Sequence, residues 1–138
     1  MQAATIRDLF GKRPRKAPPA TERRTHIAIA DLLRQDCRPD WWWTHFPSGE
    51  LRTDRTGALL KRMGLKPGVA DFLLISPEGK PHWMELKRGN LGRTTEEQEA
   101  FAALCGRVGM PYGLVRTFHE AKDQLDRWGV LRGRVKVW

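Results

Sequence analysis

Three charged side chains lie inside two otherwise apolar segments of the chain. Asp71 belongs to VADFLLI, and Glu85 and Lys87 belong to HWMELKR. Two acids and a lysine are the side chains that can hold a divalent cation and direct a water toward a phosphorus atom. These residue types therefore predict metal-assisted hydrolysis of a phosphate ester.

The spacing of the three residues fits a β-hairpin. The intervening SPEGKP contains the Pro and Gly typical of a turn. A turn centred near Glu78 pairs Asp71 with Glu85 across an antiparallel ladder, and alternation puts Lys87 on the same face. Opposed carboxylates with Cβ atoms about 5 Å apart repel each other unless a cation compensates them. Mg²⁺ is the expected cation, and Lys87 is expected to orient a water on it.

The same three residues also admit a simpler interpretation, a surface charge cluster on a solvated edge hairpin. Both segments are apolar enough to form central strands of a sheet, where charged side chains need a specific reason. We therefore prefer the catalytic interpretation.

The elements that position this hairpin follow from periodicity, caps and turn residues. They are a helix over 22–36 with Thr21 as N-cap, a strand over 41–46, a short helix over 56–63, the two hairpin strands, a helix from a capping box at Thr94–Glu97 to Gly109, a strand over 112–116 and a helix after Thr117. This order predicts an α/β fold, a mixed central β-sheet flanked by helices. The strand over 112–116 is expected to lie parallel to its predecessor.

Two polar residues are predicted to join the site from helices. Gln98 shares one helical face with Phe101 and Cys105, which puts its amide near Lys87. Glu22 begins a stripe that continues through His26, and it is a candidate third acid. The alternatives are an exposed amide at a helix start and a solvated first-turn acid that the helix dipole favours.

The charge balance points to a polyanionic partner. The chain has 25 Lys and Arg against 16 Asp and Glu, a formal net charge of +9. A basic surface binds nucleic acid because neutralised phosphates release counterions, although a merely basic soluble protein has the same composition. The candidate phosphate contacts are His45, Arg52, Arg55, Lys61, Arg62, Lys66 and Arg88, with a solvated basic loop as the alternative.

The WWW run at 41–43 has two interpretations. It could stack on unpaired bases. Alternation along a strand instead favours Trp42 as a core residue, with Trp41 and Trp43 at a subunit contact.

The chain is expected to form one domain over 21–138, preceded by a basic, Pro-containing arm over 1–20. Within that arm, TIRDLF could dock to a replication partner. No apolar run is long enough for a membrane span or a signal peptide, and the two cysteines lack zinc-site spacing. These features predict a cytoplasmic protein with reduced thiols.

Taken together, the motifs resemble the VRR-NUC branch of the PD-(D/E)xK nuclease superfamily, found in phage proteins and eukaryotic crosslink-repair nucleases. VAD and MELK match its acid and ExK signature, and GLKPGVAD matches GxxPGxPD except that Ala70 replaces Pro. HFPSGE resembles the HxPNGG turn, from which Ser48 and Glu50 depart. Glu22, Gln98 and the terminal WGxL also fit the stand-alone phage and bacterial type.

The resemblance implies a restriction-endonuclease-like core and a DNA endonuclease. Mg²⁺, with Mn²⁺ as a substitute, would be held by Asp71, Glu85 and the Leu86 carbonyl, with Lys87 assisting the water and Glu22 and Gln98 as helpers. The implied substrate is branched or flapped DNA, including four-way Holliday junctions, in replication, repair or recombination. A homodimer is implied because small stand-alone members need two copies to cut two strands.

Three other functions remain open from the sequence. They are a nucleic-acid-binding module that keeps the fold without chemistry, an RNA endonuclease, and a structural component of a phage or repair complex.

Overall fold

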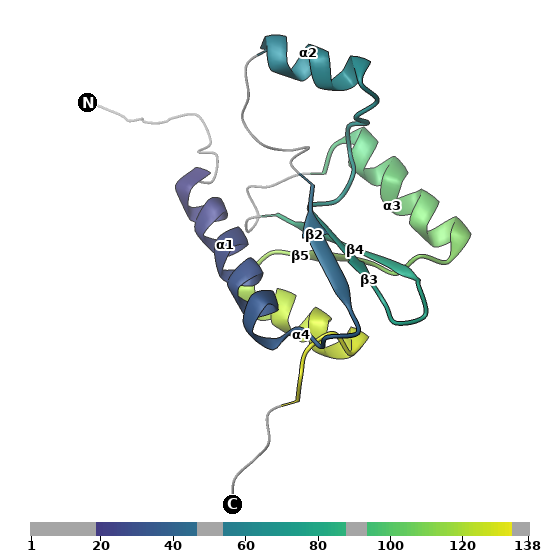
Figure 1. The fold of residues 1–138 in the computed structure, drawn as a ribbon. Helices are drawn as coiled ribbons and strands as arrows, with labels where there is room; N and C mark the ends of the chain where they lie inside the picture. The colour runs from purple at the N-terminus through teal and green to yellow at the C-terminus, as the bar shows by residue number, and fades with distance from the viewer. Residues whose placement is uncertain (1–18, 47–53, 88–93, 134–138) are drawn as a thin grey trace, which may run out of the picture.

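A computed structural model describes residues 19–46, 54–87 and 94–133. The elements in chain order are α1 (Pro19–Asp36), β2 (Trp42–His45), α2 (Asp54–Arg62), β3 (Phe72–Ile75), β4 (Pro81–Leu86), α3 (Glu96–Val108), β5 (Tyr112–Val115) and α4 (Phe118–Trp128) (Figure 1). The described strands form one sheet in the order β2-β3-β4-β5. The first two pairs are antiparallel and β4 pairs with β5 in parallel. The predicted α/β class and the parallel final pair are therefore confirmed.

The hairpin has the register that the sequence predicted. Phe72 pairs with Met84 and Leu74 pairs with His82, so the same ladder extended by one residue puts Asp71 opposite Glu85. The turn closes through Gly79, whose φ is +85° and whose N–H donates to the Ser76 carbonyl at 2.8 Å. Because β3 and β4 are the two inner strands, the carboxylate pair belongs to inner strands rather than to an edge of the sheet.

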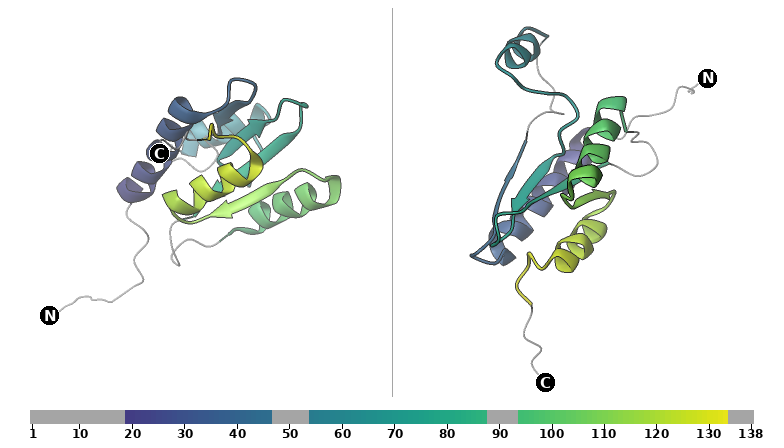
Figure 2. Two further views of the ribbon diagram at one scale, coloured as in Figure 1. Left: turned by 90° about the horizontal axis from the view of Figure 1, so that it is seen from below. Right: turned by 90° about the vertical axis from the view of Figure 1, so that its right-hand side faces the viewer.

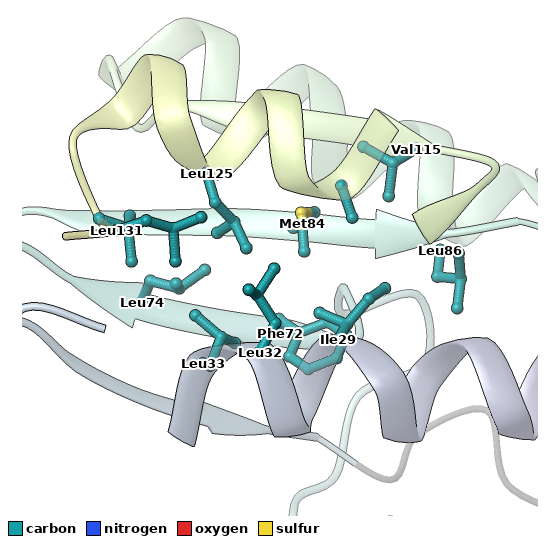
Figure 3. Close-up of a cluster of buried hydrophobic side chains, with 12 residues drawn as sticks. Ile29, Leu32, Leu33, Phe72, Leu74, Met84, Leu86, Val115, Leu125 and Leu131 are labelled. Carbon is teal, nitrogen blue, oxygen red and sulfur yellow. The ribbon is translucent and has the colours of Figure 1, made fainter. Parts of the chain in front are cut away.

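The two faces of the sheet are covered by different helices. Phe72, Leu74 and Met84 are fully buried on the face that packs against α1 and α4, with Ile29 and Leu125 among the helix residues of that core (Figure 3). These two helices lie side by side (Figure 2). On the other face, Trp83 packs edge-to-face on Phe101 of α3 with ring centroids 4.9 Å apart. Alternation therefore places the odd-numbered residues of β3 and β4, including Glu85, on the α3 face.

Two predicted helix starts are wrong by a short distance. α1 begins at Pro19 rather than after Thr21, because a proline is well suited to a first turn that has no need of its N–H. The N-cap of α3 is Thr95 rather than Thr94, and the capping box pairs it with Gln98 instead of Glu97. At α4, Thr117 is the N-cap and its hydroxyl accepts from the Glu120 N–H at 3.0 Å. The capping box that the sequence predicts there with Glu120 is only half formed, because the Glu120 carboxylate accepts from the Arg116 N–H instead of the Thr117 N–H.

The prediction for the tryptophan run is also wrong. Trp42 is 56% exposed, whereas Trp41 and Trp43 pack against the hydrophobic core. The register explains the reversal, because Trp43 pairs with buried Leu74 and shares its face, while Trp42 points to the α3 side. There α3 contacts β5 and Trp83 rather than the edge strand β2, so Trp42 stays uncovered.

The predicted N-terminal arm over 1–20 lies mostly outside the described residues, and its last two positions are the first residues of α1. The TIRDLF segment is likewise outside them. Within the described part of the chain, every helix is too short or too polar to traverse a bilayer.

Candidate active site

The carboxylates of Asp71 and Glu85 come together at one end of the sheet. Asp71 directly precedes β3, and its Oδ2 accepts from the Leu86 backbone N–H at 2.8 Å. Glu85 lies inside β4 and is only 2% exposed. The backbone hydrogen bond holds the Asp71 carboxylate against β4, so the two acids are neighbours in a largely dry environment.

This environment makes both acids hard to ionise. The pKa of Asp71 is raised to about 6, chiefly because burial removes its carboxylate from water. The pKa of Glu85 is raised to about 7, first by burial and then by the negative charge of Asp71. Lys87 acts in the opposite direction on both. The positive charge near the two carboxyl groups is therefore too small to offset their burial and mutual repulsion, as expected for opposed acids in the predicted hairpin.

Lys87 and Gln98 both approach the same oxygen of Glu85. The Lys87 Nζ lies 3.5 Å from Glu85 Oε2, and the Gln98 Nε2 donates to that oxygen at 2.9 Å. The other oxygen, Oε1, is buried and has no hydrogen-bond partner of good geometry, although the nearby Asp71 backbone N–H helps to lower the pKa of the Glu85 carboxyl. A buried carboxylate oxygen without a donor is costly, and such an atom calls for an additional ligand.

The start of α3 fixes the Gln98 amide. Its Oε1 accepts from the Thr95 backbone N–H at 2.9 Å as part of the capping box, so its nitrogen is left to face Glu85. One side chain thus joins the helix cap to the buried acid. The predicted shared face of α3 is confirmed, since Cys105 is buried and Phe101 half-buried along with Gln98.

Gly68 brings the loop before Asp71 against the same helix start. Its φ is +89°, and a Cβ at this position would lie 2.5 Å from the backbone carbonyl carbon of Glu97. Only glycine allows this approach. The GLKPG segment therefore packs directly beside Gln98, which brings the first acid and the α3 amide to the same place.

The donor set fits a magnesium ion. Glu85 offers the unpartnered Oε1, Asp71 offers a second carboxylate, and the Leu86 carbonyl points to the same side of β4 as the N–H that reaches Asp71. The described residues contain no cluster of three or more His, Cys, Asp or Glu side chains able to hold an ion. Two carboxylates, a carbonyl and several waters agree with the habits of Mg²⁺, which seldom uses an all-protein cage.

Glu22 and His45 lie at the margin of this pair. Glu22 is half-buried on α1 and its charge raises the pKa of Asp71, while His45 at the end of β2 lowers it. Glu22 does not join the two acids in a three-acid cluster within the described residues. His26 stacks on Phe72 with centroids 4.4 Å apart and meets His45 edge-to-face at 5.1 Å, so it supports this corner of the site.

Apart from His45, the predicted phosphate contacts separate into two groups. Arg55, Lys61 and Arg62 lie on α2 and Lys66 follows it, all with exposed side chains. Arg52 and Arg88 lie outside the described residues, as do Ser48 and Glu50 of the PSGE turn.

Tyr112 is a neighbour of the site that the sequence did not reveal. It is half-buried on β5 beside Trp83, and its pKa is raised by burial and then by the negative charge of Glu85. A parallel strand gives no turn from which to count its register, so no signal in the sequence placed Tyr112 near the acids.

Comparison with known proteins identifies the fold. No protein-family model matches the sequence, and no curated protein matches it. A solved structure described as "VRR_NUC domain protein" superimposes with a TM-score of 0.65 at 16% identity, covering 85% of this chain and 100% of that one. The chain therefore shares the fold of a VRR_NUC domain protein, as the motifs suggested.

Proposed function

We propose that this chain is a Mg²⁺-dependent endonuclease that hydrolyses phosphodiester bonds of DNA. The observation that carries the proposal is the buried Asp71–Glu85 pair, in which both pKa values are raised and one Glu85 oxygen lacks a partner. A structural ion pair would have no need of a second acid at this position. The fold shared with a VRR_NUC domain protein supports the same reading.

Each residue of the site has a task in that reaction. Asp71, Glu85 and the Leu86 carbonyl would hold Mg²⁺, which when bound supplies positive charge for the phosphate and lowers the pKa of water. Lys87, with its side chain 16% exposed and next to Glu85, donates hydrogen bonds that orient the attacking water. Gln98 keeps Glu85 Oε2 occupied, which leaves Oε1 for the cation.

The substrate and assembly rest on charge and on the resemblance. A net charge of +9 favours a nucleic acid, and exposed Arg55, Lys61, Arg62 and Lys66 precede Asp71 in the chain. We infer branched or flapped DNA, including Holliday junctions, as the preferred substrate and a homodimer as the form that cuts two strands. Replication, repair or recombination in a bacterial or phage-infected cytoplasm is the setting that this substrate implies.

The decisive experiment measures nicking of supercoiled, flapped and four-way-junction DNA with and without Mg²⁺. The wild type should cleave only with Mg²⁺ or Mn²⁺. Asp71→Asn and Lys87→Met should each lose at least about a hundredfold in cleavage rate, within the range for removing a group that stabilises the transition state. Both should retain salt-sensitive DNA binding. Lys80→Met, which removes an exposed lysine from the hairpin turn, is the matched control and should cleave as the wild type does.

Other outcomes identify the alternatives. Binding that survives in the wild type without any cleavage indicates a nucleic-acid-binding module. Cleavage of matched RNA in preference to DNA indicates an RNA endonuclease. Full cleavage by both site variants would disprove the mechanism, since it would show that neither residue takes part.

A further inference from the structure

The short helix α2 stands apart from the rest of the molecule. It lies beyond the end of the sheet in both Figure 1 and the right-hand view of Figure 2, and no other described helix or strand packs extensively against it. Most of its described side chains are exposed. One side of the amphipathic helix α2 is therefore exposed to solvent at this end of the sheet.

The exposed side of α2 carries large apolar residues. Leu59 is 55% exposed and Met63, in the turn directly after the helix, is 74% exposed. Residues four apart lie on one side of a helix, so the two side chains are adjacent. Arg55 and Arg62 fall on the same side by the same periodicity, and both are exposed. The result is an apolar pair with guanidinium groups beside it.

The local structure does not require these two apolar side chains. The helix ends in a Schellman motif, in which Leu65 N–H donates to Leu60 O at 2.9 Å and Gly64 N–H donates to Lys61 O at 3.0 Å. Leu60 and Leu65 occupy the positions whose side chains typically make the apolar contact of that motif, and both are half-buried. Leu59 and Met63 are therefore free for a partner.

Charge decides which partner fits. Over 54–66 this segment carries Arg55, Lys61, Arg62 and Lys66 against the single acid Asp54. Two copies of such a segment repel each other, whereas a polyanion is attracted. Proteins that bend or open nucleic acid commonly set a Leu or Met between base steps while neighbouring basic residues hold the phosphates.

We propose that Leu59 and Met63 form a wedge that enters the base stack of bound DNA, with Arg55 and Arg62 holding the flanking phosphates. This proposal deepens the nuclease function and rests on it. The segment from α2 leads through Gly68, which is pressed against the start of α3, directly to Asp71. A base step opened at α2 would lie beside the protein segment that continues to Asp71, and the need to open it would favour the distorted or branched DNA inferred above as the substrate.

The test uses the full chain in EDTA, so that binding is read without cleavage. Flapped and fully paired DNA carry one 2-aminopurine at successive steps around the branch point. At saturation, the wild-type protein should raise the fluorescence of 2-aminopurine at one or two adjacent positions. The rise is expected because unstacking this base removes its quenching by the neighbouring bases. Leu59→Gln/Met63→Gln should lose that rise yet keep nearly the same dependence of affinity on salt.

Two further variants complete the test. Arg55→Gln/Arg62→Gln should reduce the slope of log affinity against log salt by about two, one for each lost phosphate contact. Val108→Gln removes a comparably exposed apolar residue, 59% exposed, from the far end of α3 and should behave as the wild type. Circular dichroism confirms that each variant is folded.

An unchanged fluorescence rise in the Leu59/Met63 variant overturns the wedge, as does a wild type that gives no rise. A dimer that dissociates on sedimentation of that variant also overturns it, because the apolar pair would then be a subunit contact. Cleavage with Mg²⁺ is measured on the same preparations. Cleavage without a fluorescence rise rejects the wedge alone, and a rise without cleavage rejects the nuclease alone.

Discussion

At the scale of single residues, the site is defined by a conflict between burial and charge. The carboxyl groups of Asp71 and Glu85 are buried, so their ionisation costs free energy. The positive charge of Lys87 offsets only part of that cost. Gln98 satisfies one Glu85 oxygen and the other is left without a donor. Such an arrangement lowers the stability of the metal-free protein and favours cation binding.

This conflict predicts how stability depends on pH. The ordinary pKa values of 3.8 and 4.5 rise to about 6 and about 7 in the folded chain. Between about pH 4 and pH 7 the folded state therefore binds more protons than the unfolded state, so the free energy of unfolding should fall as pH rises. The stabilisation that the folded state gains from binding these protons is complete below about pH 4 and lost above about pH 7. Urea unfolding of the metal-free protein across this range measures it.

Two comparisons isolate the pair from other titrating groups. Glu85→Gln should flatten the pH dependence, whereas Glu78→Gln, at an exposed position in the turn, should leave it unchanged. Mg²⁺ should raise the unfolding midpoint of the wild type at pH 8, where both acids are ionised, and have little effect on Glu85→Gln. A steeper fall in Glu85→Gln than in the wild type would contradict the assignment.

At the scale of elements, the hairpin and the start of α3 must meet for the site to form. The β3–β4 register places the two acids opposite each other, and the capping box at Thr95 directs the Gln98 amide. The glycine at 68 allows the loop to touch the backbone of Glu97. The hairpin turn, the helix cap and Gly68 are separate local features. Together they bring the two acids, the Gln98 amide and the loop before Asp71 to the same place.

The glycine contact gives a prediction with an internal control. Gly68→Ala combines a positive φ with a Cβ that would overlap the Glu97 backbone, while Gly79→Ala has a positive φ of +85° and no atom within 4 Å. The control should lose about 1 kcal/mol of stability. Gly68→Ala should lose about 1–3 kcal/mol more from overpacking, and cleavage should fall because α3 is displaced from Glu85. Urea unfolding and the nicking assay measure both effects, and equal losses in the two variants would refute the role of the contact.

At the scale of the whole molecule, α1 and α4 cover one face of the sheet (Figures 2 and 3). On the other face, Glu85 accepts a hydrogen bond from Gln98 of α3. The hydrophobic core holds the hairpin between α1 and α4 through buried residues of β3 and β4. The basic helix α2 and the exposed Trp42 lie away from that core. The molecule thus combines a well-packed candidate site with exposed basic and apolar surface.

The excess of basic residues predicts strong salt dependence of DNA binding. With a net charge of +9, log affinity should fall linearly with log salt, with a slope of about −0.9 for each phosphate neutralised on duplex DNA. Fluorescence anisotropy in EDTA across a salt series measures the slope. Asp71→Asn should keep or slightly strengthen binding, because it removes a negative charge beside the phosphate. Affinity that does not change with salt would show that the basic residues are not the contact surface.

Much of the site could be predicted because its determinants are local in sequence. The turn at Gly79 and the alternation of side chains are enough to pair Asp71 with Glu85 and to put Lys87 on the same face. The Gln98 position followed from helical periodicity in the same way. These inferences succeeded because a short hairpin and a capped helix each have only one register compatible with their apolar residues.

What the sequence could not decide are relations between segments far apart in the chain. The face that each tryptophan presents depended on how the edge strand β2 aligns with β3, and the assignment was reversed. The proximity of Tyr112 to Glu85 came from a parallel register, and that of Gly68 to Glu97 came from the docking of α3. The sequence by itself thus determined the residues to which the chemistry is assigned in the proposal, the hairpin and the class of fold. Only the tertiary structure decided that Tyr112 and the loop at Gly68 join Lys87 and Gln98 around the acids, because long-range packing is set by the whole core.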